Sequence, residues 1–323
     1  MAELKTSQAE AQPKVPRKWL GFWSDYSVAI AFVVIVIIAS LLNHRFLDYQ
    51  NLINVLMQVS IIGIIALGMT IVMLSGGIDL SVGSALALVG VATITAINAS
   101  HSILIGVLTA LLVGAFIGLL NGLMIAKGKI ASFIATLGMM AAARSLALYF
   151  ADGGSKTSEV QAFSNIANGS LGIIDYPIII FFILTMAVYV LMQKTRFGRY
   201  VYAIGSNEKA ALLSAIKVNQ VKILVYTLCG LLVGVAATIE TSRLNSISSS
   251  SSGMSYELDA IAAVIISGTR MTGGRGKVLG TFFGILILGI INNMMNLMNI
   301  SPYLQGTVKG VIIVLAVLLQ KKE

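Results

Sequence analysis

Long apolar runs that carry no charged side chain are the feature that most limits what this chain can fold into. The stretch 103–126 contains no Asp, Glu, Lys or Arg, and several other stretches of similar length are nearly as apolar. About 20 such residues are enough for a helix to cross the hydrocarbon core of a bilayer. Only 11% of the 323 residues are charged, whereas soluble domains average about a quarter. The sequence therefore predicts an all-α integral membrane protein and excludes a soluble globular fold.

About ten apolar runs are predicted to span the membrane, in a single transmembrane domain over 26–320 that follows a polar tail over 1–25. We expect the first run to be a retained span, because it is long for a signal peptide and lacks a small-residue cleavage site. The runs cover residues 26–42, 53–74, 80–98, 103–126, 130–150, 177–192, 221–239, 257–268, 278–298 and 303–320.

The basic residues predict the orientation of these spans, because lysine and arginine collect in the cytoplasmic loops of membrane proteins. With the N-terminus inside and ten alternating spans, all but five of the 22 basic residues fall in inner segments. The five are Arg45, Lys156 and Arg243 in outer loops, and Arg144 and Lys309 within spans. Both termini and the loop 193–220 are thus predicted to be cytoplasmic, and the loops 151–176 and 240–256 external.

The chain lacks the sequence patterns of a catalytic or nucleotide-binding site. It contains no HExxH, CxxC or GxSxG pattern, and its two Gly-Lys pairs, at Gly128 and Gly276, lack the earlier glycine of a phosphate loop. We therefore predict no cofactor or metal in this chain, and a separate ATPase subunit if ATP drives it. The net charge of +9 fits cytoplasmic loops and does not imply nucleic acid.

Polar residues within or beside the spans are candidates for a translocation path or gate. The two ionisable residues inside spans, Arg144 and Lys309, are basic, which argues against a proton- or sodium-coupled carrier. We expect Arg144 to extend toward the outer interface, and Lys309 to make a buried contact or to act in gating. Asp79 follows a flexible glycine pair and is expected to cap the next helix or to contact a partner or inner gate.

The ninth predicted span contributes three further path candidates. Asn292, Asn293 and Asn296 fall mostly on one helical face. Their amides suit either a neutral polyol or hydrogen bonds between helices, and the sequence does not separate these uses.

Glycines four residues apart predict where helices approach closely. Gly114, Gly118 and Gly122 lie in one span, and Gly230 and Gly234 lie in another. The spacing indicates tight packing, or helices that slide past one another during transport.

The polar stretch 197–216 predicts a short amphipathic helix on the cytoplasmic side. Gly205 interrupts the chain, one of the next two residues supplies an N-cap, and Glu208 falls in the first turn, where its charge favours the helix dipole. Small residues follow, so the helix can dock closely against a partner; the alternative is a helix lying on lipid. The predicted contact residues are Gly205, Asn207, Glu208, Ala211 and Ser214.

Three separated stretches together resemble one known family. They are 74–84 (LSGGIDLSVGS), 198–208 (GRYVYAIGSNE) and 256–264 (YELDAIAAV), the last followed by Ser267-Gly-Thr and Gly273-Gly-Arg-Gly-Lys. From about residue 26 to the end, in order and spacing, the chain resembles the permease subunits of bacterial ABC importers for simple sugars, the group of ribose, allose, galactose and xylose permeases. The serine-rich segment 248–252 departs from the family pattern and leaves the sugar open.

The resemblance implies a fold and a set of partners. The implied fold is that of the vitamin B12 importer (type II) permease, with about ten transmembrane helices and with spans two to five and seven to ten as inverted halves. A homodimer, or a pseudo-dimer of two related chains, in the lipid of the bacterial inner membrane would enclose the path, and a periplasmic binding protein would deliver the sugar. A cytoplasmic ATPase holding ATP and Mg would dock on 205–214, which the resemblance identifies as the coupling helix.

The predicted function is therefore import of a ribose- or allose-like monosaccharide, driven by ATP hydrolysis in another subunit, with no enzymatic activity in this chain. Two alternatives are a branched-chain amino-acid permease of the same general plan, and a self-sufficient facilitator or ion-coupled carrier. Uptake by this chain alone without ATP would favour the carrier.

Overall fold

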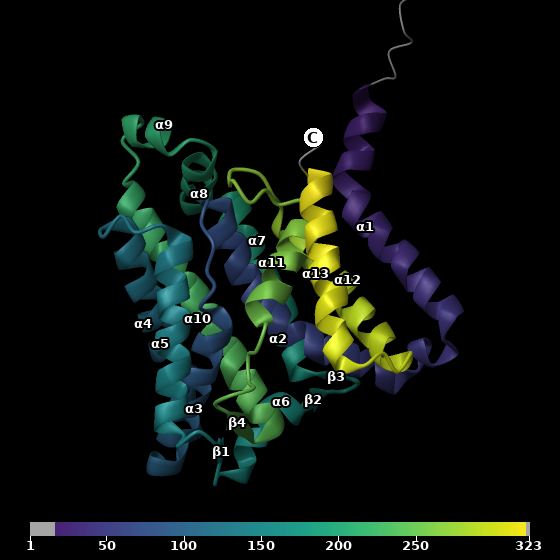
Figure 1. Cartoon of the computed structure of the whole chain (residues 1–323), viewed down its shortest axis with the longest axis vertical. Helices are drawn as coiled ribbons and strands as arrows, with labels where there is room; N and C mark the ends of the chain where they lie inside the picture. The colour runs from purple at the N-terminus through teal and green to yellow at the C-terminus, as the bar shows by residue number, and fades with distance from the viewer. Residues whose placement is uncertain (1–16, 321–323) are drawn as a thin grey trace, which may run out of the picture.

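Helices make up nearly all of the structure, a computed structural model that describes residues 17–320 (Figure 1). Most of the predicted tail 1–25 lies outside the described residues, and its last part belongs to α1. The helices are α1 (Arg17–Leu42), α2 (Tyr49–Leu74), α3 (Val82–Ser100), α4 (Ile103–Ala126), α5 (Ser132–Phe150), α6 (Asn165–Asn168), α7 (Tyr176–Lys194), α8 (Arg196–Ser206), α9 (Glu208–Leu213), α10 (Val218–Leu244), α11 (Tyr256–Ile266), α12 (Val278–Leu297) and α13 (Pro302–Gln320), with 3-10 turns η1 (His44–Leu47) and η2 (Gln161–Ser164).

Seven helices in the described part of the chain are long and apolar enough to cross a membrane, namely α2, α3, α4, α5, α7, α10 and α12. The protein is therefore a multi-pass helical membrane protein, as predicted. The eighth predicted span, 257–268, is as short in the structure as in the sequence, because α11 has only 11 residues. At about 1.5 Å per residue it is roughly 16 Å long, which is about half of the ~30 Å hydrocarbon core.

The helices α2 and α10 form the centre of the bundle. Every residue of α2 from Gly63 to Leu74 is buried, and α10 packs against α2, α3 and α4. A methyl group at Gly118 would meet the backbone of Tyr226 on α10, and one at Gly230 would meet the carbonyl of Gly114 on α4. The predicted glycine spacing thus corresponds to a direct backbone contact between α4 and α10.

Two non-helical segments lead into helices that start inside the bundle. The segment 75–81 joins α2 to α3, and the segment 245–255 joins α10 to α11. The second segment packs against the first turn of α3, where Gly253, at φ +68°, lies against the carbonyl of Gly83. A side chain at Gly253 would collide with that carbonyl, so both positions are restricted to glycine by contact.

The two ends of the bundle differ (Figure 1). One end, here the α9 face, carries α8, α9 and the loop 267–277, and the C-terminal end of α13 lies on the same side. The other end, the hairpin face, carries two antiparallel strand pairs: β1 (Ser155–Thr157) with β4 (Ser246–Ser248), and β2 (Ser170–Leu171) with β3 (Ile174–Asp175).

Candidate functional site

The polar stretch on the α9 face folds into two helices, where the sequence predicted one. Thr195 caps α8 by accepting a hydrogen bond from the amide of Gly198 (3.3 Å), so helix begins about ten residues earlier than expected. Asn207 then caps α9, and its Oδ1 accepts from the amide of Ala210 (3.0 Å). Glu208 occupies the first turn of α9. The second helix thus has the cap and the acidic first turn that the sequence predicted.

The sequence predicted that Gly205 interrupts the chain before the helix. In the structure it lies instead in the last turn of α8. A side chain there would collide with the carbonyl of Leu74 and come within 2.5 Å of the amide of Gly274. That same amide donates to the Leu74 carbonyl (3.0 Å), and Tyr202 of α8 donates to the carbonyl of Gly276 (3.0 Å). Because Gly205 has no side chain, α8 can pack directly against the end of α2 and the loop 267–277.

The exposed surface of α9 differs from the predicted contact set. Asn207, Glu208 and Ser214 are exposed, whereas Ala211 is only 4% exposed and faces the rest of the chain. Leu212 and Leu213 are 65% and 88% exposed. These two leucines were not in the predicted set, although a pair of leucines in an otherwise polar loop was visible in the sequence.

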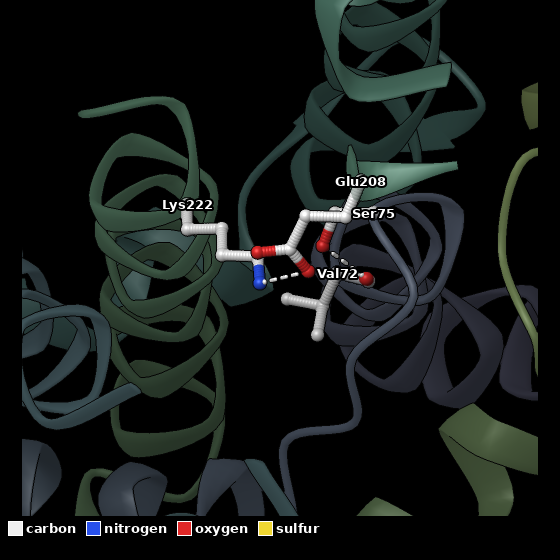
Figure 2. A network of polar contacts seen from close by, with 4 residues as sticks. All are labelled: Val72, Ser75, Glu208 and Lys222. Carbon is white, nitrogen blue, oxygen red and sulfur yellow. Dashed lines mark hydrogen bonds and ion pairs between the residues drawn. The ribbon is translucent and has the colours of Figure 1, made fainter. Parts of the chain in front are cut away.

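An ion pair fixes α9 to α10, as Figure 2 shows. Lys222 Nζ of α10 lies 2.8 Å from Glu208 Oε2. Beside this pair is a cavity of about 470 Å³, bounded by the segment after α2, the α4–α5 connection and the start of α10. Its polar lining includes Lys129, Glu208, Asn219 and Lys222. Glu208 therefore has an internal partner as well as an exposed position.

Asp79 is buried in the segment 75–81, where it is 2% exposed. Its Oδ1 accepts from the amide (2.9 Å) and the hydroxyl (2.6 Å) of Ser81. Asn121 of α4 donates to the same hydroxyl (2.9 Å). These contacts fix the segment before α3 and connect it to α4, but the N-cap position of α3 is Ser81, whose side chain makes no capping hydrogen bond. Asp79 therefore does not cap the helix as the sequence predicted, and instead binds the residue that precedes the helix.

Lys309 forms an ion pair with Asp259, at 2.9 Å from Nζ to Oδ2. The pair joins α13 to the first turn of α11, and both side chains are largely buried. This is the buried contact that the sequence offered as one of two roles for Lys309. Asp259 was not predicted as its partner, because the two residues are 50 positions apart.

The three predicted asparagines of α12 point to different neighbours. Asn293 exchanges two hydrogen bonds with Asn51 of α2 (3.1 and 2.7 Å). Asn296 accepts from Gln305 of α13 (2.9 Å), and Asn292 has a buried Oδ1 with no hydrogen-bond partner among the described residues. Two of the three thus join helices, and the structure does not bring them together with Asp79 or Lys309 around one site.

Comparison with known proteins identifies the family of the chain. Residues 51–317 match the family model described as "Branched-chain amino acid transport system / permease component". The chain is 45% identical to the "Ribose import permease protein RbsC" of Bacillus subtilis (strain 168), over 99% of each protein. It is 37% identical to the "L-arabinose transport system permease protein AraH" of Escherichia coli (strain K12), over 99% of this chain and 97% of that protein.

A third relative carries the name of the transporter class. The chain is 35% identical to the "L-arabinose ABC transporter permease protein AraH" of Azospirillum brasilense, over 92% of this chain and 88% of that protein. No solved structure matches the chain. Because the family model covers most of the chain and these relatives align over nearly its whole length, the chain belongs to the family of membrane permease components described by that model.

Proposed function

We propose that the chain is the permease subunit of a binding-protein-dependent ABC importer for a monosaccharide. The observation that carries the proposal is the identity of 45% to a ribose import permease over 99% of both chains, together with arabinose permeases at 37% and 35%. The chain has no phosphate loop, so ATP would be hydrolysed by a separate subunit that binds ATP and Mg. A periplasmic binding protein would present the sugar, and the chain itself would not act as an enzyme.

The surface for the ATPase is α9, with the α9 face in the cytoplasm. The basic residues of the loop 193–220 and of 270–277 lie on this face, as expected for the cytoplasmic side of a bacterial inner-membrane protein. Asn207, Glu208 and Ser214 present polar groups there, and Leu212 and Leu213 present apolar area that water does not favour. Gly205 and Ala211 contribute indirectly, by seating the two helices against the bundle.

The fold we propose is the type II permease arrangement, with about ten membrane-embedded helices in two inverted halves, α2–α5 and α10–α13. Its support is the matching interruption in each half: a long helix, an irregular segment, and a helix that begins inside the bundle. The contact between Gly83 and Gly253 joins the second interruption to the first turn of α3, the helix that follows the first interruption.

A second copy of the chain would complete the path, along the face formed by α5 and α13. These helices lie on either side of α11 in Figure 1. Gly138, Gly306 and Gly310 have nothing near the position of a side chain, so they leave room for close approach of another helix. The glycines of α4, in contrast, are already used against α10. On this face Lys309 is the best-placed of the predicted gate residues, because its ion pair links α13 to α11.

The test is uptake of radiolabelled ribose, arabinose and leucine into proteoliposomes that contain the chain with its ATPase and binding protein. We expect sugar uptake that requires ATP and both partners. Equal uptake by the chain alone, without ATP, would contradict an ABC mechanism and favour a self-sufficient carrier.

The leucine arm addresses the one competing substrate class. The description of the family model names branched-chain amino acids, whereas the relatives named above are sugar permeases. ATP-dependent leucine uptake without sugar uptake would replace the monosaccharide with an amino acid and leave the ABC mechanism in place.

A further inference from the structure

The serine loop, defined as Ser246–Ser255, is an ordered part of the bundle. Its first residues pair with β1, and the amide and hydroxyl of Ser249 both donate to the carbonyl of Gly154 (3.2 and 2.7 Å). From α5, Arg144 donates through Nη1 to the carbonyls of Ser249 (2.8 Å) and Ser252 (3.0 Å). The side chain of Arg144 therefore binds the backbone of this loop, a partner that the sequence did not predict.

The part of the loop after β4, residues 249–255, leads from the hairpin face into the bundle. Its far end leads into α11, which is about 16 Å long and ends at the loop 267–277 on the α9 face. The start of α11 is thus near the middle of the ~30 Å hydrocarbon core. Arg144, which binds the loop, lies six residues before the end of α5 on the hairpin face. It is therefore about 9 Å inside the bundle from that end. The serine loop therefore occupies the half of the bundle nearer the hairpin face.

Irregular backbone at this depth cannot face lipid, because its polar groups would lose hydrogen bonds to water. It is tolerated only where protein buries it or where it lines a water-filled cavity. Ser249 and Ser252 are buried by the chain, but Ser250, Ser251 and Ser255 are exposed. The hydroxyls of Ser251 and Ser255 make no hydrogen bond within residues 17–320. Exposed, unpartnered hydroxyls at this depth require water or a polar ligand.

We propose that the serine loop lines the aqueous path and that its free hydroxyls contact the transported polyol, with Ser251 as the main contact. The inference rests on the proposed import of a sugar and adds a residue that meets it. The polyol hydroxyls both donate and accept, as does a serine hydroxyl. Arg144 acts as a positioning residue, because it holds the carbonyls of the loop and leaves the exposed hydroxyls free.

The first test uses the single cysteine of the chain, Cys229, which is fully buried and gives little background labelling. Ser251→Cys is made in the full complex and treated with a charged, membrane-impermeant methanethiosulfonate. We expect it to react at least tenfold faster than Leu112→Cys, a control on α4 that is 69% exposed on the proposed lipid face. We also expect the modification to block ATP-driven uptake. A Ser251→Cys complex that transports but is not labelled would overturn the inference.

The second test addresses contact with the sugar. Ser251→Ala should lower the maximal rate of ATP-driven sugar uptake about fivefold, the usual loss for one neutral hydrogen bond, and Ser251→Thr should retain most of the rate. Ser170→Ala on β2 is the matched control and should be unchanged. Labelling at 251 with an unchanged Ser251→Ala rate would refute the contact. Absence of ATP-driven sugar uptake by the unsubstituted complex would instead refute the proposed function, so the two failures are distinguishable.

Discussion

Single glycines determine how closely the helices of this protein approach. A side chain introduced at Gly230 would first meet the carbonyl oxygen of Gly114, which belongs to backbone and cannot rotate away. Gly138 on α5 has no atom within 4 Å of the same position. The two glycines look alike in the sequence, since both lie inside apolar helices. They differ only in what the neighbouring helix brings against them.

This contrast predicts opposite effects of one substitution. Gly→Ala gains about 1 kcal/mol of helix propensity, while forcing an extra methyl group into a packed contact costs about 1–3 kcal/mol. In the monomeric chain in detergent, Gly230→Ala should therefore lower the thermal unfolding midpoint, and Gly138→Ala, whose methyl group meets nothing within one chain, should leave it unchanged or raise it. Equal midpoints for both variants would contradict the direct backbone contact between α4 and α10.

At the scale of elements, local signals were readable from the sequence and tertiary ones were not. The cap at Asn207 and the acidic first turn at Glu208 depend on neighbours within four residues, and both are present. The hydrogen bond from Arg144 to the serine loop joins two residues that are 105 positions apart in the chain. A hydrophobic periodicity in the sequence cannot predict such a pair.

Charged substitutions on the exposed surface of α9 should impair coupling to the ATPase without unfolding the protein. Leu212→Glu with Leu213→Glu places two charges on side chains that are largely exposed, so insertion and thermal stability should be unchanged. ATP hydrolysis stimulated by the loaded binding protein should fall at least tenfold, because the charges would be desolvated at the docked surface. Leu171→Glu, 71% exposed on the opposite face, is the control. Full coupling in the leucine variant would exclude α9 as the docking helix.

At the scale of the whole molecule, the outer surface is divided between bulky and small residues. The exposed residues of α4 include Leu104, Leu112 and Phe116, which suit lipid. On α13, Gly306 and Gly310 have open space above them, which suits another helix. The general class, a multi-pass helical permease, followed from the apolar runs and the three family-like stretches, whereas this division required the packing of each helix.

The separation of bulky exposed residues on α4 from open glycines on α13 predicts that two copies of the chain meet along α13. Gly310→Cys should form a covalent dimer with a short bifunctional maleimide in membranes, and Leu112→Cys should not, because it faces lipid on the proposed arrangement. The readout is the shift from monomer to dimer on a denaturing gel without reductant. Cross-linking at Leu112→Cys in place of Gly310→Cys would move the interface to α4 and contradict the proposed path.

The meeting of Gly83 with Gly253 restricts the motions open to the molecule. Two backbones in direct contact, with no side chains between them, can rotate over one another but cannot separate without opening a void in the bundle. If the proposed halves α2–α5 and α10–α13 move during transport, we expect them to rotate about this contact and not to separate at it. On the proposed docking at α9, such a rotation would narrow the path at one face of the bundle while it widens at the other.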